Sequence, residues 1–261
     1  MASLIALTRE ISDAITACEL THLARAPIDV DRARAQHASY ERALEAMGCQ
    51  IVRLPTGVDM ADSVFVEDVA IVLDEVAVIT RPGAESRRSE TTAVAAELSK
   101  YRPLVHMAAP ATLDGGDVLV VGRSMFVGRT SRTNDAGIDQ LRNAVQPFGY
   151  AVSPASVRGC LHLKSAVTAL DYQALLVNRQ WASEEDFPGF ELIDVDPAEP
   201  AGANIVRVGA DLLYASMFPL TRARLERKGY DITSIDVSEL AKAEGAVTCC
   251  SLIFSDSPRA A

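Results

Sequence analysis

The sequence lacks the features that would place it in a membrane, in a secretory pathway or in a multidomain chain. No apolar run approaches the roughly 20 residues that a membrane-spanning helix requires. Residues 1–9 do not combine a charged start with a long apolar stretch, so we expect no signal peptide. No tract rich in proline, glycine and serine divides the chain. We therefore expect a soluble protein in which residues 1–261 form a single domain.

Basic residues are also in the minority. The chain has 25 Lys and Arg against 35 Asp and Glu, which gives a net charge of −10. Nucleic acids and anionic membranes attract basic surfaces, so we expect neither as a partner. The acidic excess alone does not predict a cationic ligand, because surface carboxylates mostly serve solubility.

Disulfide and metal patterns are missing as well. The five cysteines stand at positions 18, 49, 160, 249 and 250, without a CxxC pair or the spacing of a metal site. The adjacent Cys249 and Cys250 could pair with each other only in a strained ring. No two histidines have a ligand spacing such as HxxxH. This pattern is typical of reduced thiols, so we expect a cytoplasmic protein without a metal.

The chain does contain a repeated unit of two short apolar strands, a helix and a third strand. The first strands of three copies begin at Val69, Val118 and Val167, so successive copies open 49 residues apart (118 − 69 and 167 − 118). The remaining predicted strands are 50–54, 76–80, 125–127, 150–153, 174–177, 205–208, 212–215 and a short one from 105; the predicted helices are 32–47, 90–101, 136–145, 221–228 and 237–243.

This repeat favours a propeller-like array of strand units around an axis. A doubly wound βαβ domain is the alternative, but a hairpin precedes each helix and no glycine-rich phosphate loop follows the first strand. We therefore expect no bound nucleotide. We also expect the last two strands, 231–236 and 252–254, to pair with each other. Residues 11–27 should form a short helix and surface loop, and residues 181–186 a solvated loop.

Polar side chains stand just before the first strand of several copies and before the final strand. In a radial array these positions meet at one end of the axis, so residues far apart in sequence can share one pocket. The residues concerned are Glu67, Asp68, Asp114, Asp117, His162, Ser165, Asn204 and Cys249.

The pair Cys249–Cys250 can be interpreted in two ways. A buried cysteine behaves as a small hydrophobe, so the pair could simply belong to a packed core. A thiol that meets a histidine, here His162, is instead a nucleophile whose reactivity depends on its thiolate fraction. Nearby carboxylates would oppose that thiolate by charge repulsion.

A cationic substrate would reconcile the thiol with the carboxylates. A guanidinium held by Asp62, Asp68 and Asp114 would satisfy these acids through bidentate hydrogen bonds and would stabilise the thiolate as it binds. Attack of the Cys249 thiolate on the guanidinium carbon gives a tetrahedral adduct. His162 then protonates the departing amine and activates the water molecule that frees the enzyme.

Six motifs, taken in order, identify a family. They are DSVFVED (62–68), RPGAESRRSE (81–90), LDGGDVL (113–119), FVGRTSRTN (126–134), LHLKS (161–165) and TCCS (248–251). Together they resemble the dimethylarginine dimethylaminohydrolases, which belong to the guanidino-group-modifying enzymes of the pentein superfamily, over about residues 19–254. The resemblance implies an α/β fold, a five-bladed α/β-propeller of repeated ββαβ units. It also implies hydrolysis of Nω-methylated arginine to citrulline and methylamine or dimethylamine through a covalent cysteine intermediate, without a cofactor.

The resemblance assigns roles to the reacting end of the pocket. The family's nucleophile falls on Cys249, the first of the pair, because the motif reads Cys-x-Ser. Its acid/base histidine falls on His162, and Asp114 matches a carboxylate near that histidine, where some members have Glu. The guanidinium-binding carboxylates fall on Asp62 and Asp68, with Glu67 beside them.

The resemblance also assigns the amino-acid end of the substrate. Arg87 and Arg132 match the pair that binds the α-carboxylate, a task suited to the planar guanidinium. Leu20 matches a lid residue whose backbone carbonyl meets the α-amino group. Ala243, six residues before the nucleophile, falls where another backbone contact is expected.

Two other functions stay open. One is a related guanidine-modifying enzyme such as an arginine deiminase, although true deiminases generally carry an added helical module for which this chain is too short. The other is a non-catalytic protein that binds arginine derivatives. The partner that we expect is a small cationic methylated arginine, and a homodimer is left open.

Overall fold

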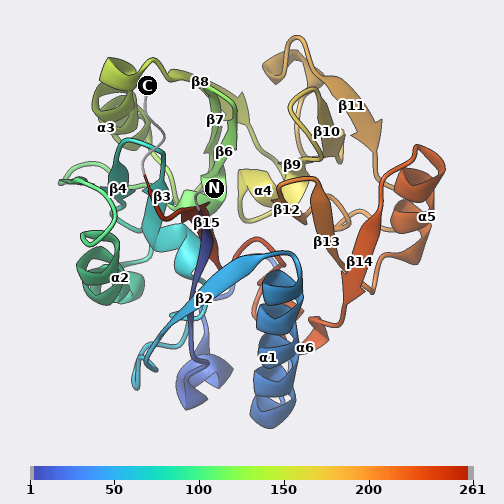
Figure 1. Ribbon diagram of the computed structural model, residues 1–261, viewed down its shortest axis with the longest axis horizontal. Helices are drawn as coiled ribbons and strands as arrows, with labels where there is room; N and C mark the ends of the chain where they lie inside the picture. The colour runs from blue at the N-terminus through green and yellow to red at the C-terminus, as the bar shows by residue number, and fades with distance from the viewer. Residues whose placement is uncertain (1–2, 258–261) are drawn as a thin grey trace.

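The computed structural model describes residues 3–257, which form five three-stranded sheets arranged around a central axis (Figure 1). In each sheet the first strand is antiparallel to the second and the third is parallel to the second. The sheets are β3 (Ala70–Val72), β4 (Ala77–Ile79) and β5 (Leu104–His106); β6 (Val118–Val121), β7 (Ser124–Arg129) and β8 (Ala151–Ser156); β9 (Val167–Ala169), β10 (Ala174–Val177) and β11 (Glu191–Asp194); β12 (Ile205–Val208), β13 (Asp211–Ala215) and β14 (Ile232–Ile235); and β15 (Leu252–Ser255), β1 (Leu4–Arg9) and β2 (Cys49–Leu54).

Helices connect the second and third strands of most sheets and cover the outside of the ring (Figure 1). The two longest begin at capping residues: the side chains of Asp29 and Asn134 accept hydrogen bonds from the first turns of α1 and α3. The α-helices are α1 (Val30–Ala46), α2 (Thr91–Leu98), α3 (Asp135–Val145), α4 (Leu163–Ala166), α5 (Pro219–Arg227) and α6 (Ser238–Ala241). The 3₁₀ turns are η1 (Asp13–Ala17), η2 (Val66–Val69), η3 (Glu85–Glu90), η4 (Gly115–Asp117), η5 (Gln146–Phe148) and η6 (Glu184–Asp186).

The apolar core lies between neighbouring sheets and not within any one of them. Each of five buried clusters combines side chains from two adjacent sheets. Successive residues of a strand face opposite sides, so Ile5 and Leu7 of β1 enter one cluster and Ala6 enters the next. Both faces of a sheet are therefore buried, which explains why the strands are nearly continuous apolar runs.

The predicted pairing of the last two strands is wrong. β14 pairs with β13, and β15 pairs with β1, an N-terminal strand that the prediction missed. β1 is almost fully buried between β15 and β2, so both ends of the chain contribute to one sheet. β1 lies at the opposite end of the sequence from β15, and without it the prediction had no other partner for β15.

The third copy departs from the prediction as well. Residues 181–186 were expected to be a solvated loop, but Trp181 packs against the cluster between the second and third copies, and β11 follows η6. Phe187, just after η6, is fully buried with its ring 5.0 Å from that of Phe126. A short 3₁₀ turn therefore replaces the helix in this sheet.

No helix within residues 3–257 has both the length and the apolar character needed to span a membrane. All five cysteines lie in this range and are free thiols. The ends of the predicted domain, residues 1–2 and 258–261, lie outside the described residues.

Candidate active site

Short helical turns stand at the head of the innermost strands and meet at one end of the axis. η2 precedes β3, η4 precedes β6 and α4 precedes β9; η4 contacts both of the other turns. The first strands of neighbouring sheets also contact one another, as β15 does with β3 and β9 with β6 and β12. This arrangement brings the polar residues before these strands together.

A small pocket of about 20 Å³ lies at this end of the axis. A cavity needs roughly 10–15 Å³ to admit one water molecule, so the pocket is nearly closed. Seven of the ten predicted site residues are in its wall: Asp62, Asp68, Arg87, Arg132, His162, Ala243 and Cys249. Five further residues of the wall were not predicted: Glu19, Phe65, Leu161, Glu244 and Gly245.

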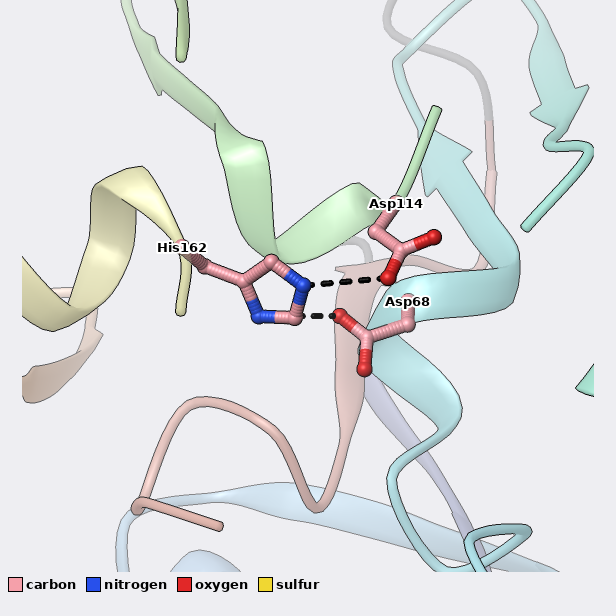
Figure 2. Close-up of side chains that lie close together, drawn as sticks. All are labelled: Asp68, Asp114 and His162. Carbon is pink, nitrogen blue, oxygen red and sulfur yellow. Dashed lines mark hydrogen bonds and ion pairs between the residues drawn. The ribbon is translucent and has the colours of Figure 1, made fainter. Parts of the chain in front are cut away.

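His162 is buried between two carboxylates (Figure 2). Its Nε2 lies 3.0 Å from Asp114 Oδ2, and its Nδ1 lies 3.7 Å from Asp68 Oδ1. Burial alone would lower the pKa of His162, but Asp68, Asp114 and the nearby Asp117 outweigh it and raise the pKa to about 9. The imidazole is therefore protonated at neutral pH and can donate a proton.

The glycines of the LDGGD motif allow the imidazole to lie against the backbone. A Cβ on Gly116 would stand 2.5 Å from His162 Nδ1 and 2.7 Å from Asp68 Oδ1, so a larger residue would displace one of them. The Gly116 amide also donates a 3.0 Å hydrogen bond to Asp68. Asp117, fully buried, accepts a 2.9 Å hydrogen bond from the Leu163 amide and so fixes the turn that carries His162.

Arg87 is engaged inside the protein. Its guanidinium donates to Asp68 Oδ2 at 2.5 Å, to Glu90 at 2.9 Å, and to the backbone carbonyls of Asp62 and Phe65. Burial would raise the pKa of Asp68, but His162 and Arg87 hold it below its usual range. Arg87 thus keeps Asp68 ionised, and its predicted contact with a substrate carboxylate stays a prediction.

Arg132 is placed differently from Arg87. Its Nη2 lies 3.1 Å from Thr21 Oγ1, and its Nη1 lies 3.7 Å from Asp114 Oδ2. Both of these contacts are weaker than the buried ion pairs of Arg87, so Arg132 can exchange them for a substrate carboxylate more readily.

Cys249 and Cys250 have different surroundings. Cys249 is half-buried in the pocket wall, and its Sγ accepts a hydrogen bond from the Ala246 amide at 3.4 Å. Burial, together with Glu67 and Asp68, raises the pKa of the Cys249 thiol. Cys250 is fully buried in the core cluster beneath it. Of the pair, Cys249 is the thiol that a ligand in the pocket would meet, and a cationic ligand would lower its pKa.

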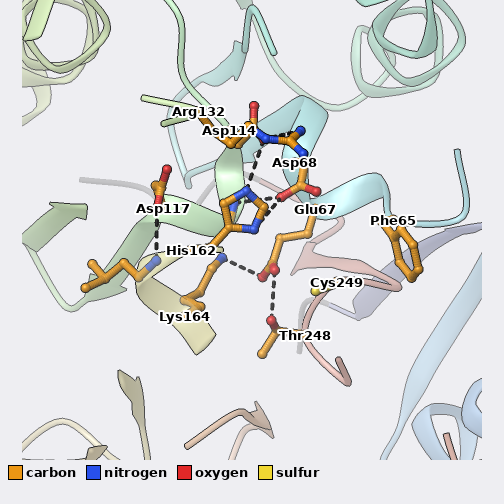
Figure 3. Close-up of polar contacts among 12 residues, drawn as sticks. Phe65, Glu67, Asp68, Asp114, Asp117, Arg132, His162, Lys164, Thr248 and Cys249 are labelled. Carbon is orange, nitrogen blue, oxygen red and sulfur yellow. Dashed lines mark hydrogen bonds and ion pairs between the residues drawn. The ribbon is translucent and has the colours of Figure 1, made fainter. Parts of the chain in front are cut away.

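Glu67 lies beneath the pocket and not in its wall (Figure 3). Its carboxylate bonds to Lys164 Nζ at 2.5 Å and to Thr248 Oγ1 at 2.8 Å. It faces a second cavity of about 280 Å³, which the innermost strands surround along the axis. Because η2 turns the chain tightly, the adjacent Glu67 and Asp68 face different cavities, and the predicted contact of Glu67 with the substrate stays a prediction.

Glu19 lies in another part of the pocket wall. Its amide donates to Asp62 Oδ2 at 3.0 Å, whereas the neighbouring Leu20 side chain packs on the core. Residues 11–27 were expected to form a short helix and surface loop. η1 is that short helix, Ile15 and Cys18 are buried, and most of residues 19–27 are exposed.

Within residues 3–257, one group of side chains could jointly hold a metal ion. It consists of Asp68, Asp114 and His162, whose donor atoms all lie within 4.8 Å of one another. Each already bonds to a protein partner, and the guanidinium of Arg87 lies 2.5 Å from Asp68. A cation at that position repels a metal ion, so this group does not favour a metal.

A scan against protein-family models finds no match. The chain is, however, 40% identical over 255 residues to an N(G),N(G)-dimethylarginine dimethylaminohydrolase of Streptomyces coelicolor, covering 97% of each chain. It is 34% identical over 248 residues to the protein of the same name from Pseudomonas aeruginosa, covering 94% of this chain and 96% of that one.

Solved structures extend the likeness to the fold. The P. aeruginosa enzyme, with a cysteine replaced by serine and citrulline bound, has a TM-score of 0.92 at 31% identity and covers 97% of this chain and 100% of that one. A dimethylarginine dimethylaminohydrolase with a histidine replaced by glycine, in adduct with S-methyl-L-thiocitrulline, has a TM-score of 0.91 at 32% identity and the same coverage. The N-terminal domain of a cyanobacterial arginine dihydrolase shares the fold at 16% identity, with a TM-score of 0.85 over 97% of this chain and 98% of that one. The predicted five-bladed α/β-propeller is confirmed.

Proposed function

The chain belongs to the dimethylarginine dimethylaminohydrolase family, and we propose on this premise that it hydrolyses Nω-methylated arginine to L-citrulline and dimethylamine or methylamine. The observation that carries the proposal is one small pocket that holds the Cys249 thiol, the His162 imidazole and the Asp62 and Asp68 carboxylates. The citrulline-bound and thiocitrulline-bound relatives support it, because both ligands belong to this chemistry.

Substrate binding supplies the charge that the thiol needs. Asp62 and Asp68 accept hydrogen bonds from the guanidinium, and Asp68 is kept ionised for this task by His162 and Arg87. The incoming cation lowers the pKa of Cys249, which burial and the carboxylates had raised, so that the thiolate forms when substrate is present.

The reaction then takes two displacements. The Cys249 thiolate attacks the guanidinium carbon, and the protonated His162 gives its proton to the dimethylamino nitrogen as the C–N bond breaks. Dimethylamine leaves and a cationic thiouronium remains on sulfur. His162, now neutral, takes a proton from water, whose oxygen attacks the same carbon. The C–S bond then breaks and the hydroxyl proton of the adduct goes to the departing sulfur, which gives citrulline and the free Cys249 thiol. Asp114 orients the imidazole through its 3.0 Å hydrogen bond to Nε2.

The amino-acid end of the substrate determines which guanidines bind. Arg132 holds the α-carboxylate, and Arg87 contributes mainly by holding Asp68 and the carbonyls of the pocket rim. The backbone of Leu20 and Ala243 meets the α-amino group and the substrate chain. Glu67 supports the floor of the pocket through Lys164 and Thr248.

Residues 1–261 act in this proposal as one catalytic domain, since the site draws residues from turns at the heads of several sheets. The free cysteines favour a cytoplasmic location. The net charge of −10 favours neither nucleic acid nor membrane as a partner. A homodimer is compatible with the proposal and is decided by the mass of the protein in solution.

The first experiment compares citrulline release from dimethylarginine, monomethylarginine and unmodified arginine at matched concentrations. We expect turnover of the methylated forms with little on arginine. Cys249→Ser should abolish release, whereas the matched control Cys250→Ser should retain most of it because Cys250 lies in the core. Preference for arginine would indicate a deiminase, and no turnover on any of the three would favour a binding protein.

A further inference from the structure

The Glu244 carboxylate binds three consecutive backbone amides of the segment that covers the pocket. The Thr21 amide lies 3.1 and 3.0 Å from its two oxygens, and the amides of His22 and Leu23 lie 2.5 and 2.6 Å from Oε1. We propose that Glu244 is a positioning residue that holds residues 19–23, hereafter the lid, closed over the substrate. This inference rests on the proposed function.

Successive amides that point at one anion form a strong site. Hydrogen bonds to an ionised acceptor are shorter and stronger than those between neutral groups, and consecutive N–H groups form a concavity that suits an anion. The contacts join residues 221–223 positions apart in sequence, so they tie the N-terminal part of the chain to the turn between α6 and Cys249.

The backbone at Glu244 is shaped for this contact. Glu244 is the one non-glycine residue within residues 3–257 with a positive φ, at 57°. Side chains rarely adopt that conformation, and it persists only where the surroundings impose it. The following Gly245 packs so close to the Phe65 ring that a Cβ would stand 2.2 Å from it. The chain is thus fixed on one side by Phe65 and on the other by the lid.

The lid also contacts two predicted substrate-binding side chains. On one side of Leu20, the Glu19 amide donates to Asp62, and on the other side the Thr21 hydroxyl accepts a hydrogen bond from Arg132. Leu20 is therefore held between two anchored residues, and opening the lid would change the partners of both Asp62 and Arg132. Glu244 itself lines the pocket.

The pocket leaves little room beside the lid. Its volume of about 20 Å³ is close to that of one water molecule, so opening of the lid would ease the entry of an arginine side chain. The bonds to Glu244 then set how strongly the closed state is favoured and how well the substrate is positioned once the lid closes again.

The test uses Glu244→Ala and Glu244→Gln, with Glu45→Ala on the exposed face of α1 as the matched control. Hydrogen exchange of the Thr21–Leu23 amides is measured without substrate. Loss of charge-assisted hydrogen bonds should speed exchange about tenfold or more in Glu244→Ala. Glu244→Gln, which keeps an acceptor oxygen, should lie between Glu244→Ala and wild type.

The kinetic readout is the KM for dimethylarginine against the single-turnover rate at saturation. We expect Glu244→Ala to raise KM about tenfold and to change the single-turnover rate less, since the reacting groups stay in place. Exchange and KM equal to wild type would overturn the inference, and so would faster exchange with an unchanged KM. An inactive wild-type enzyme would refute the proposed function instead, while the exchange measurement would still decide whether Glu244 holds the lid.

Discussion

The raised pKa of His162 makes a prediction about stability that needs no substrate. The side chain is 5% exposed, and its pKa rises from 6.5 to about 9 in the folded protein. At about 1.4 kcal/mol for each tenfold change, this corresponds to about 3 kcal/mol of folding free energy. Because the folded protein holds the proton more tightly, this stability is fully present below pH 6.5 and is lost as the pH rises through about 9.

The loss can be measured by urea denaturation at pH values between 6.5 and 8.5. Over this interval the titration of His162 alone should lower the free energy of unfolding by about 2 kcal/mol. The comparator is His162→Asn, which keeps the other titrating groups and removes this one. We expect a clearly smaller decrease in the variant. Equal decreases in the two proteins would show that the imidazole does not hold its proton between Asp68 and Asp114, and would refute the general-acid role.

Three further variants test the roles of the two arginines and of the glycine beside His162. Arg132→Ala should raise KM strongly with modest loss of stability. Arg87→Ala leaves Asp68 and Glu90 buried without their partner, so it should cost about 3–5 kcal/mol of unfolding free energy. Denaturant titration and steady-state kinetics of both variants would show the contrast, and similar stability losses would contradict it. Gly116→Ala should lower the citrulline release rate about 100-fold, because its Cβ would displace the His162 imidazole by contact; a variant with wild-type rate would show that the imidazole can shift without cost.

Much of the fold could be predicted from the sequence where strands are buried on both faces. The apolar runs of β6, β10 and β12 were located with their observed bounds because most residues of such a strand face a core cluster on one side or the other. β11, by contrast, carries acidic residues at both of its ends and gives no such signal. β1 was missed because its partners lie at the far end of the chain and in the next element, which no local pattern reveals.

The site shows the same limit. The ordered motifs identified the residues of the site but not where each one faces. Glu67 and Asp68 are neighbours in sequence, yet they face different cavities because η2 turns the chain tightly between them. Glu244 belongs to no motif, and its role depends on amides more than 200 residues away. A sequence pattern shows which chemistry is present, whereas the partner of each charged group is decided by tertiary contacts.

The sheet that joins the two ends of the chain has a consequence for synthesis. Cys249 stands just before β15, the last strand, which is held by β1, the first strand to be made. A nascent or truncated chain that has not reached β15 has the carboxylates and the imidazole but no thiol held against them. The position of Cys249 beside the imidazole and the carboxylates is therefore fixed only once β15 has paired with β1 and the ring is complete.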